Sequence, residues 1–180
     1  MADNQTPHSQ PTSIDRCPDC GAPAPGGREG CHAFWIEFAA RAYIDLRYAP
    51  MRDLAFDAYC MQHLGTYCRS AKSYAAHLTR LCCGLEHGGA QTVYFAIQRW
   101  LNGDPRIDKP EPPVRLGTLT VADGLAASDV EEYTRRVHAW AGDVWTAYAA
   151  QHEIVHSWIQ AAMSIRKGVP DQPFDDEEDY

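Results

Sequence analysis

The sequence has no long apolar run and little positive charge. It contains 16 Lys and Arg residues against 24 Asp and Glu residues, which gives a formal net charge of −8. A nucleic-acid-binding surface needs clustered positive charge, and a helix that crosses a membrane needs about 20 consecutive apolar residues. Because neither feature is present, we expect no nucleic-acid partner and no membrane partner. A protein partner or a homo-oligomer remains possible.

The N-terminal segment lacks the basic region and the apolar run of a secretory signal. We therefore expect a cytoplasmic protein, whose seven cysteines are reduced or bind metal and do not form a disulfide framework. Residues 1–16 are polar and contain two prolines, which predicts a disordered N-terminus. The acidic run near the end predicts a disordered tail over residues 169–180. A single helical metal-binding domain is expected between them, over residues 17–168.

Helical periodicity dominates the rest of the sequence, and no convincing strand pair is present. The prolines of residues 104–117 indicate an extended crossover. Thr120 and Ser128 each precede an acidic residue by three positions, a pattern typical of helix starts. The spacing predicts helices over residues 32–46, 50–63, 70–85, 92–101 and, without interruption, 128–167. We therefore expect an all-α fold: a bundle of about five helices with a long C-terminal helix and an N-terminal cysteine zinc knuckle.

The motif C-P-D-C-G at residues 17–21 is the most specific signal. Thiolates at Cys17 and Cys20 can grip one tetrahedral zinc ion, and the following glycine permits a left-handed turn. Cys31 is a plausible third ligand. For the fourth, His32 would have to fold back, so a residue from a later helix such as His63 fits at least as well. A redox C-x-x-C usually opens a helix after a strand, and neither flank fits that alternative. Three thiolates in a closed shell favour a structural zinc ion.

Several histidines fall within predicted helices. Ser73 and His77 are one helical turn apart, so the serine hydroxyl could orient the imidazole ring. His152 and His156 share one face of the last predicted helix and could chelate a metal ion together. A lone helical histidine is more often a packed or surface residue, and that alternative stays open for each of them.

Residues 152–156 read H-E-I-V-H, which matches the H-E-x-x-H motif of a zinc-protease helix. A metzincin continuation would place glycine and histidine where Ile159 and Ala162 stand. The chain therefore lacks the additional glycine and histidine of the metzincin motif, and we do not expect a protease. From the apolar stripe of this helix, we expect His152 to face the bundle interior and Glu153 to be exposed.

Several segments together resemble one bacterial family, the domain-of-unknown-function 5946 family. The segments are CPDCG, Cys31, FDAYCMQH, KSYAAHLTRLC, LGTLTVAD and HAWAGDVWTAYAAQH, and the resemblance extends from Cys17 to Trp158. This resemblance implies a similar fold, and it implies no particular reaction. The family pattern carries over to Cys17, Cys20, Cys31, Asp57, Tyr59, Gln62, His63, Lys72, Ser73, His77, Leu119, Thr120, Trp140, Trp145 and His152. This chain departs from it at Arg52 and His156, where many members have histidine and arginine.

A looser resemblance is to the DinB/YfiT-like metal-binding four-helix bundles. It implies one histidine ligand from an early helix, here His63 or His77, and an H-x-x-x-H pair from the last helix, here His152 with His156. Because the match covers only three residues, it is an analogy of geometry.

Two hypotheses for the function follow. In the first, the protein is a zinc-binding helical adaptor or regulatory subunit with a structural cysteine site. In the second, it is a metal-dependent enzyme, a hydrolase or thiol transferase, with a histidine-lined site in the bundle. The possible pocket of that enzyme comprises Asp57, Tyr59, Gln62, Ser73, His77, His152 and His156.

Overall fold

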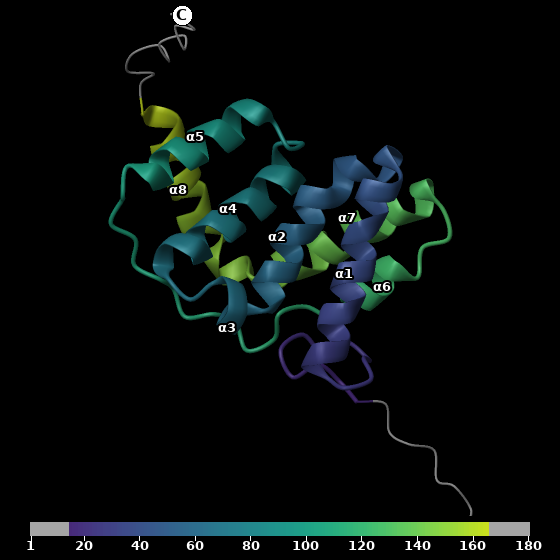
Figure 1. The fold of residues 1–180 in the computed structure, drawn as a ribbon. Coiled ribbons are helices and arrows are strands. Elements are labelled where there is room, and N and C mark those ends of the chain that lie inside the picture. The colour runs from purple at the N-terminus through teal and green to yellow at the C-terminus, as the bar shows by residue number, and fades with distance from the viewer. Residues whose placement is uncertain (1–14, 166–180) are drawn as a thin grey trace, which may run out of the picture.

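The computed structural model describes residues 15–165, and helices make up most of this part (Figure 1). The α-helices are α1 (Arg28–Ile44), α2 (Arg52–Gln62), α3 (Leu64–Tyr67), α4 (Ala71–Glu86), α5 (Gln91–Asn102), α6 (Val121–Leu125), α7 (Val130–Ala147) and α8 (His152–Ser164), with 3-10 helices η1 (Leu46–Met51) and η2 (Ala149–Gln151). Among the described residues, the only β-type pairing is an isolated bridge between Arg16 and Pro23. The all-α prediction is confirmed.

Helix α2 lies at the centre of the fold. It packs against α4 and α7, while α5 packs against α4 and α8, and α1 packs against α6 (Figure 1). Large aromatic side chains fill the space between these helices. Trp140 and Tyr133 on α7 are fully buried, and Phe38 on α1 stacks on Tyr133 with 4.9 Å between ring centroids. One continuous core therefore joins the first helix to the C-terminal pair. None of the helices described is long and apolar enough to cross a membrane.

The predicted continuous C-terminal helix is wrong, because the helix is interrupted between Ala147 and His152. The reason is tertiary: α7 packs on α2, whereas α8 packs on α5, and one straight helix cannot follow both. At the break, the buried Tyr148 hydroxyl donates to the Met61 carbonyl of α2, 2.6 Å away. The Gln151 side chain accepts from Tyr74 and donates to the Glu111 carbonyl. These bonds hold the chain in a turn that periodicity alone does not indicate.

Smaller boundaries also differ from the prediction. Helix α1 begins at Arg28 and ends before Leu46, whose side chain is 80% exposed and does not continue the buried stripe. Thr120 caps α6 as expected. The cap of α7 is Asp129, because its carboxylate accepts from the Glu132 N–H. The predicted disordered segments, residues 1–16 and 169–180, lie outside the described residues except for Asp15 and Arg16, which pair with the cysteine loop.

Candidate metal centre

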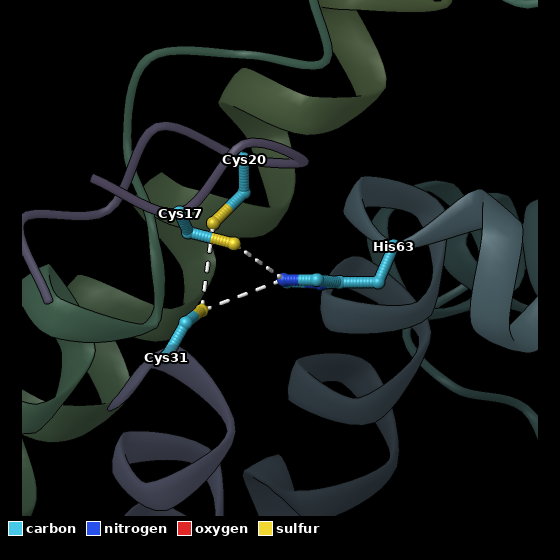
Figure 2. A group of neighbouring side chains, drawn as sticks. All are labelled: Cys17, Cys20, Cys31 and His63. Atoms are coloured by element: carbon cyan, nitrogen blue, oxygen red, sulfur yellow. Dashed lines mark hydrogen bonds between the residues drawn. The ribbon is translucent and has the colours of Figure 1, made fainter. Parts of the chain in front are cut away.

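Three cysteines and one histidine converge where the N-terminal loop meets α1 and α2 (Figure 2). Cys17 and Cys20 come from the loop, Cys31 from the first turn of α1, and His63 directly follows α2. Their four donor atoms all lie within 4.8 Å of one another. Cys17, Cys31 and His63 are buried, and Cys20 is partly buried. The structure therefore brings together all four predicted ligands in a cluster that can hold a metal ion.

The distances in this cluster match the edges of a tetrahedron. Zinc–sulfur and zinc–nitrogen bond lengths imply edges of about 3.8 Å between two sulfurs and about 3.6 Å between sulfur and nitrogen. The Cys20 and Cys31 sulfurs are 3.6 Å apart. The His63 Nε2 atom lies 3.6 Å from the Cys17 sulfur and 3.4 Å from the Cys31 sulfur. These three distances are within a few tenths of an ångström of tetrahedral edges, and every other pair of donor atoms lies within 4.8 Å.

Glycines and one ion pair shape the loop that carries the first two cysteines. Gly21 has φ +79°, the left-handed conformation expected after the second cysteine, and its N–H donates to the Cys17 carbonyl. Asp19 accepts two hydrogen bonds from Arg28 at 2.7 and 2.8 Å, which ties the loop to α1. Gly30 permits the closest approach, since an added Cβ would lie 1.9 Å from the Pro25 oxygen. The loop is thus fitted to the start of α1, where Cys31 sits.

The orientation of His63 is set from within α2. Its Nδ1 atom lies 2.7 Å from the Tyr59 carbonyl oxygen, so Nδ1 carries the proton and donates it there. Nε2 is then free to act as a ligand, an arrangement typical of metal-binding histidines. The Tyr59 ring stacks on the imidazole with 4.0 Å between centroids, and Trp35 stacks on Tyr59 in turn. Tyr59, predicted as a pocket residue, instead supports a ligand.

The thiols of the cluster influence one another's ionisation. A hydrogen bond from the Cys31 thiol lowers the pKa of Cys20 to about 4, although burial opposes this shift. The same hydrogen bond, together with burial, raises the pKa of Cys31. Burial also raises the pKa of Cys17, against backbone N–H groups that favour its thiolate. Crowding therefore favours a single thiolate among the protein groups alone, and a bound cation would stabilise the other two.

The remaining predicted pocket residues do not gather into one site. Asp57 is fully buried, and its Oδ1 accepts from His77 Nδ1 at 2.9 Å. Burial raises the pKa of Asp57. Ser73 closes the first turn of α4 with Ser70, so it does not orient His77 as predicted. Gln62 uses its amide to donate to the Leu116 and Leu119 carbonyls and to accept from Trp140. Gln62 thus holds the crossover against the core.

The two histidines of H-E-I-V-H do not form a chelating pair. The His152 ring stacks on Trp145, with 3.8 Å between centroids, and its Nε2 lies 2.9 Å from the Trp145 carbonyl. It is half-buried against the buried Trp145, so it lies at the edge of the core and not within it. His156 Nε2 contacts Glu86 at 2.7 Å instead. Glu153 is exposed, as predicted. The analogy to a three-histidine bundle site is also wrong, because no group of convergent ligands within residues 15–165 combines these histidines with His63 or His77.

A further group was missed by sequence reasoning. Cys82, Glu86 and His156 bring their donor atoms within 4.8 Å of one another. Cys82 is buried, whereas Glu86 is exposed. The only sequence signal is the four-residue spacing of Cys82 and Glu86, since His156 comes from a helix 70 residues further along the chain.

The comparisons with known proteins identify the family. No curated protein and no solved structure matches the chain. The family of unknown function DUF5946 matches residues 15–149, which include all four residues of the cysteine–histidine cluster. The match ends before α8, so it leaves His152 and His156 outside. It covers more than half of the sequence and confirms the resemblance noted from the motifs. The chain belongs to the family of unknown function DUF5946.

Proposed function

We propose that the protein is a zinc-stabilised helical adaptor or regulatory subunit, in which Cys17, Cys20, Cys31 and His63 hold one structural zinc ion. The observation that carries this proposal is the convergence of three sulfurs and one imidazole nitrogen within 4.8 Å of one another. Thiolate and imidazole ligands in this geometry are typical of structural zinc sites, whereas catalytic zinc keeps an open position. The cysteine-type zinc site also requires reduced thiols, which fits a cytoplasmic protein.

The burial of the ligands supports a structural role. Cys17, Cys31 and His63 are 2%, 0% and 3% exposed, so little space is left for a substrate beside the ion. Apart from the four candidate ligands, polar contacts such as the Asp19–Arg28 ion pair hold the loop that carries Cys17 and Cys20. Among its apolar side chains, only Ala22 and Ala24 join the core. The ion would therefore connect residues 15–27 to α1 and α2, and its binding energy would contribute directly to folding.

Exposed apolar side chains at the end of α1 support the adaptor role. Tyr43, Ile44 and Leu46 are 76%, 84% and 80% exposed. A cavity of about 290 Å³ between α1 and α2 is lined in part by Tyr43, Trp35 and Phe56. Neighbouring apolar side chains exposed beside a hollow are typical of a protein–protein contact. A protein partner therefore fits this end of the molecule better than a nucleic acid, because the protein is acidic overall.

X-ray absorption at the zinc edge tests the metal site directly. Full-length protein, purified under reducing conditions and loaded with one equivalent of zinc, should show three sulfur ligands and one nitrogen ligand at bond lengths of about 2.3 and 2.0 Å. His63→Gln should lose the nitrogen ligand, while His77→Gln, a matched change at a histidine outside the cluster, should leave the spectrum unchanged. A shell dominated by oxygen or nitrogen in the wild-type protein would contradict the proposal.

The adaptor role is tested by the oligomeric state and by binding of a purified partner. An Ile44→Asp variant places a charge at the exposed end of α1, and Val114→Asp is the control, because Val114 is fully exposed elsewhere. We expect Ile44→Asp alone to abolish self-association or complex formation, with an unchanged melting temperature. A wild-type chain that remains monomeric and binds no purified partner, or equal effects of both variants, would contradict this role.

A further inference from the structure

Three metal-ligating side chains of different kinds meet where α4 and α8 pack together. Cys82 and Glu86 are four residues apart on α4, so they share one face of that helix. His156 lies on the second turn of α8 and reaches the same place. A thiol, a carboxylate and an imidazole thus approach within 4.8 Å of one another. We propose that Cys82, Glu86 and His156 form a second, solvent-accessible site for a divalent transition-metal ion.

The geometry requires only small side-chain movements. Tetrahedral coordination places a carboxylate oxygen and an imidazole nitrogen about 3.3 Å apart, and each of them about 3.6 Å from a thiolate sulfur. The Glu86 Oε2 and His156 Nε2 atoms are now 2.7 Å apart in a hydrogen bond. Their side chains are 37% and 44% exposed, so both can move apart by tenths of an ångström without disturbing the core. Cys82 is buried and forms the inner wall of the site.

A neighbouring tryptophan positions the carboxylate. Trp145 Nε1 donates a hydrogen bond of 2.9 Å to Glu86 Oε1, which directs Oε2 toward His156. Hydrogen bonds of this kind orient the ligands of metal sites and strengthen ion binding. The stacked His152 ring in turn fixes the Trp145 indole. The Glu86 carboxylate is therefore already oriented as a metal ligand would be. A simple ion pair between Glu86 and His156 would not require Cys82 beside it.

The donor set selects the class of ion. Magnesium and calcium prefer oxygen ligands, whereas one thiolate, one imidazole and one carboxylate suit zinc, cobalt or nickel. Three protein ligands leave a fourth position, and the partial exposure of Glu86 and His156 opens that position to water. The site thus differs in kind from the closed cluster at Cys17.

Binding exchanges a proton for the metal ion. Burial raises the pKa of Cys82 to about 12, so the thiol must release its proton when the metal–sulfur bond forms. The Nε2 proton of a neutral His156 moves to Nδ1 by exchange with water, which leaves Nε2 free for the ion. Because this site offers three protein ligands with one thiolate, whereas the cysteine–histidine cluster offers four ligands with three thiolates, its affinity should be lower. The second ion should accordingly bind only after the first site is filled.

Cobalt titration of the zinc-loaded full-length protein tests the proposal. Zinc bound at the first site is spectroscopically silent, so a second ion appears as tetrahedral cobalt absorption and as quenching of tryptophan fluorescence near Trp145. Equilibrium dialysis counts the ions. We expect one cobalt ion per chain beside the retained zinc. Glu86→Gln and His156→Gln should each weaken cobalt binding by about 100-fold or more, since even changes at residues that only support a ligand cost up to that much.

Matched substitutions make the result specific. Glu153→Gln changes an exposed glutamate of α8, and His138→Gln changes an exposed histidine of α7; both should bind cobalt like the wild type. All variants should keep the first zinc ion, so this inference can fail while the structural zinc site stands. Cys82→Ala gives a further check, with zinc retention as proof of folding. Absence of a cobalt ion from the wild type at micromolar free cobalt, or equal binding by Glu86→Gln and His156→Gln, would overturn the proposal.

Discussion

Replacing Cys31 with alanine should separate the contribution of the metal ion from that of core packing. Cys31 is fully buried and its sulfur lies within 3.6 Å of the Cys20 sulfur and 3.4 Å of His63 Nε2. Cys60 is an ideal comparison, because it is equally buried on α2 but belongs to neither group of convergent ligands. Both substitutions remove one buried sulfur atom. Only the first should remove a ligand.

The expected difference follows from ligand linkage. An ion that binds only the folded state at 1,000 times its dissociation constant stabilises that state by about 4 kcal/mol. In a protein of this size, each kcal/mol shifts the melting temperature by about 2–4 °C. At such a zinc concentration, Cys31→Ala should therefore melt about 8–16 °C below the wild type through loss of the ion, in addition to the loss caused by removing a buried sulfur. Cys60→Ala should lose about 1 kcal/mol, a typical value for one substitution, and melt about 2–4 °C lower.

Calorimetry with and without a zinc chelator provides the assay. The wild type and Cys60→Ala should both lose the zinc-dependent part of their stability when chelator is added, whereas Cys31→Ala should not respond. Amide hydrogen exchange should locate the loss, with residues 15–27 exchanging faster in Cys31→Ala and in the chelated wild type. The reasoning is refuted if the chelator removes zinc from the wild type without changing its melting temperature or the exchange of this loop.

Two further predictions concern the loop and the start of α7. Gly30→Ala should cost about 3 kcal/mol, because the added Cβ would lie 1.9 Å from the Pro25 oxygen; Gly65→Ala, with open space around its Cβ, should be neutral or slightly stabilising, and denaturant unfolding compares the two. Hydrogen bonds from the Ser128 N–H and hydroxyl lower the pKa of Glu132 to about 2. Its contribution to stability is therefore complete above pH 4.5 and is lost as the pH falls toward 2. Glu132→Gln should lower the melting temperature at pH 7 and converge with the wild type near pH 2; an equal difference at both pH values would contradict this assignment.

The cysteine site was largely predictable because its chemistry is local in the sequence. The two-residue spacing of Cys17 and Cys20, with a glycine after them, already indicates a turn that grips an ion. Cys31 follows closely enough to be recruited by the same loop. His63 was one of two options, since sequence spacing does not show which later helix passes the loop. The packing of α1 beside α2, through the Trp35 and Tyr59 stack, decides the choice.

The residues of the predicted pocket make tertiary contacts that the sequence could not show. Gln62 satisfies two carbonyls of the crossover and one indole N–H, all from residues more than 50 positions away. Asp57 is bonded to His77 from the neighbouring helix. Polar side chains of this kind hold loops and helices in register, and only a tertiary structure distinguishes them from binding residues.

The break before α8 shows how one tertiary event changes the chemistry of a motif. In a straight helix, Trp145 and His152 would be about 10.5 Å apart along the axis, and His156 would lie a further 6 Å along it. The observed ring stack of 3.8 Å between Trp145 and His152 is possible only because the chain turns between them. Because of that turn, His152 Nε2 contacts the Trp145 carbonyl, and His156 lies beside Glu86 on α4. The same turn therefore prevents His152 and His156 from binding one ion as in a zinc protease, and it places His156 beside Cys82 and Glu86. A variant that straightened this region should lose cobalt binding at α4 while it keeps zinc at the N-terminal loop.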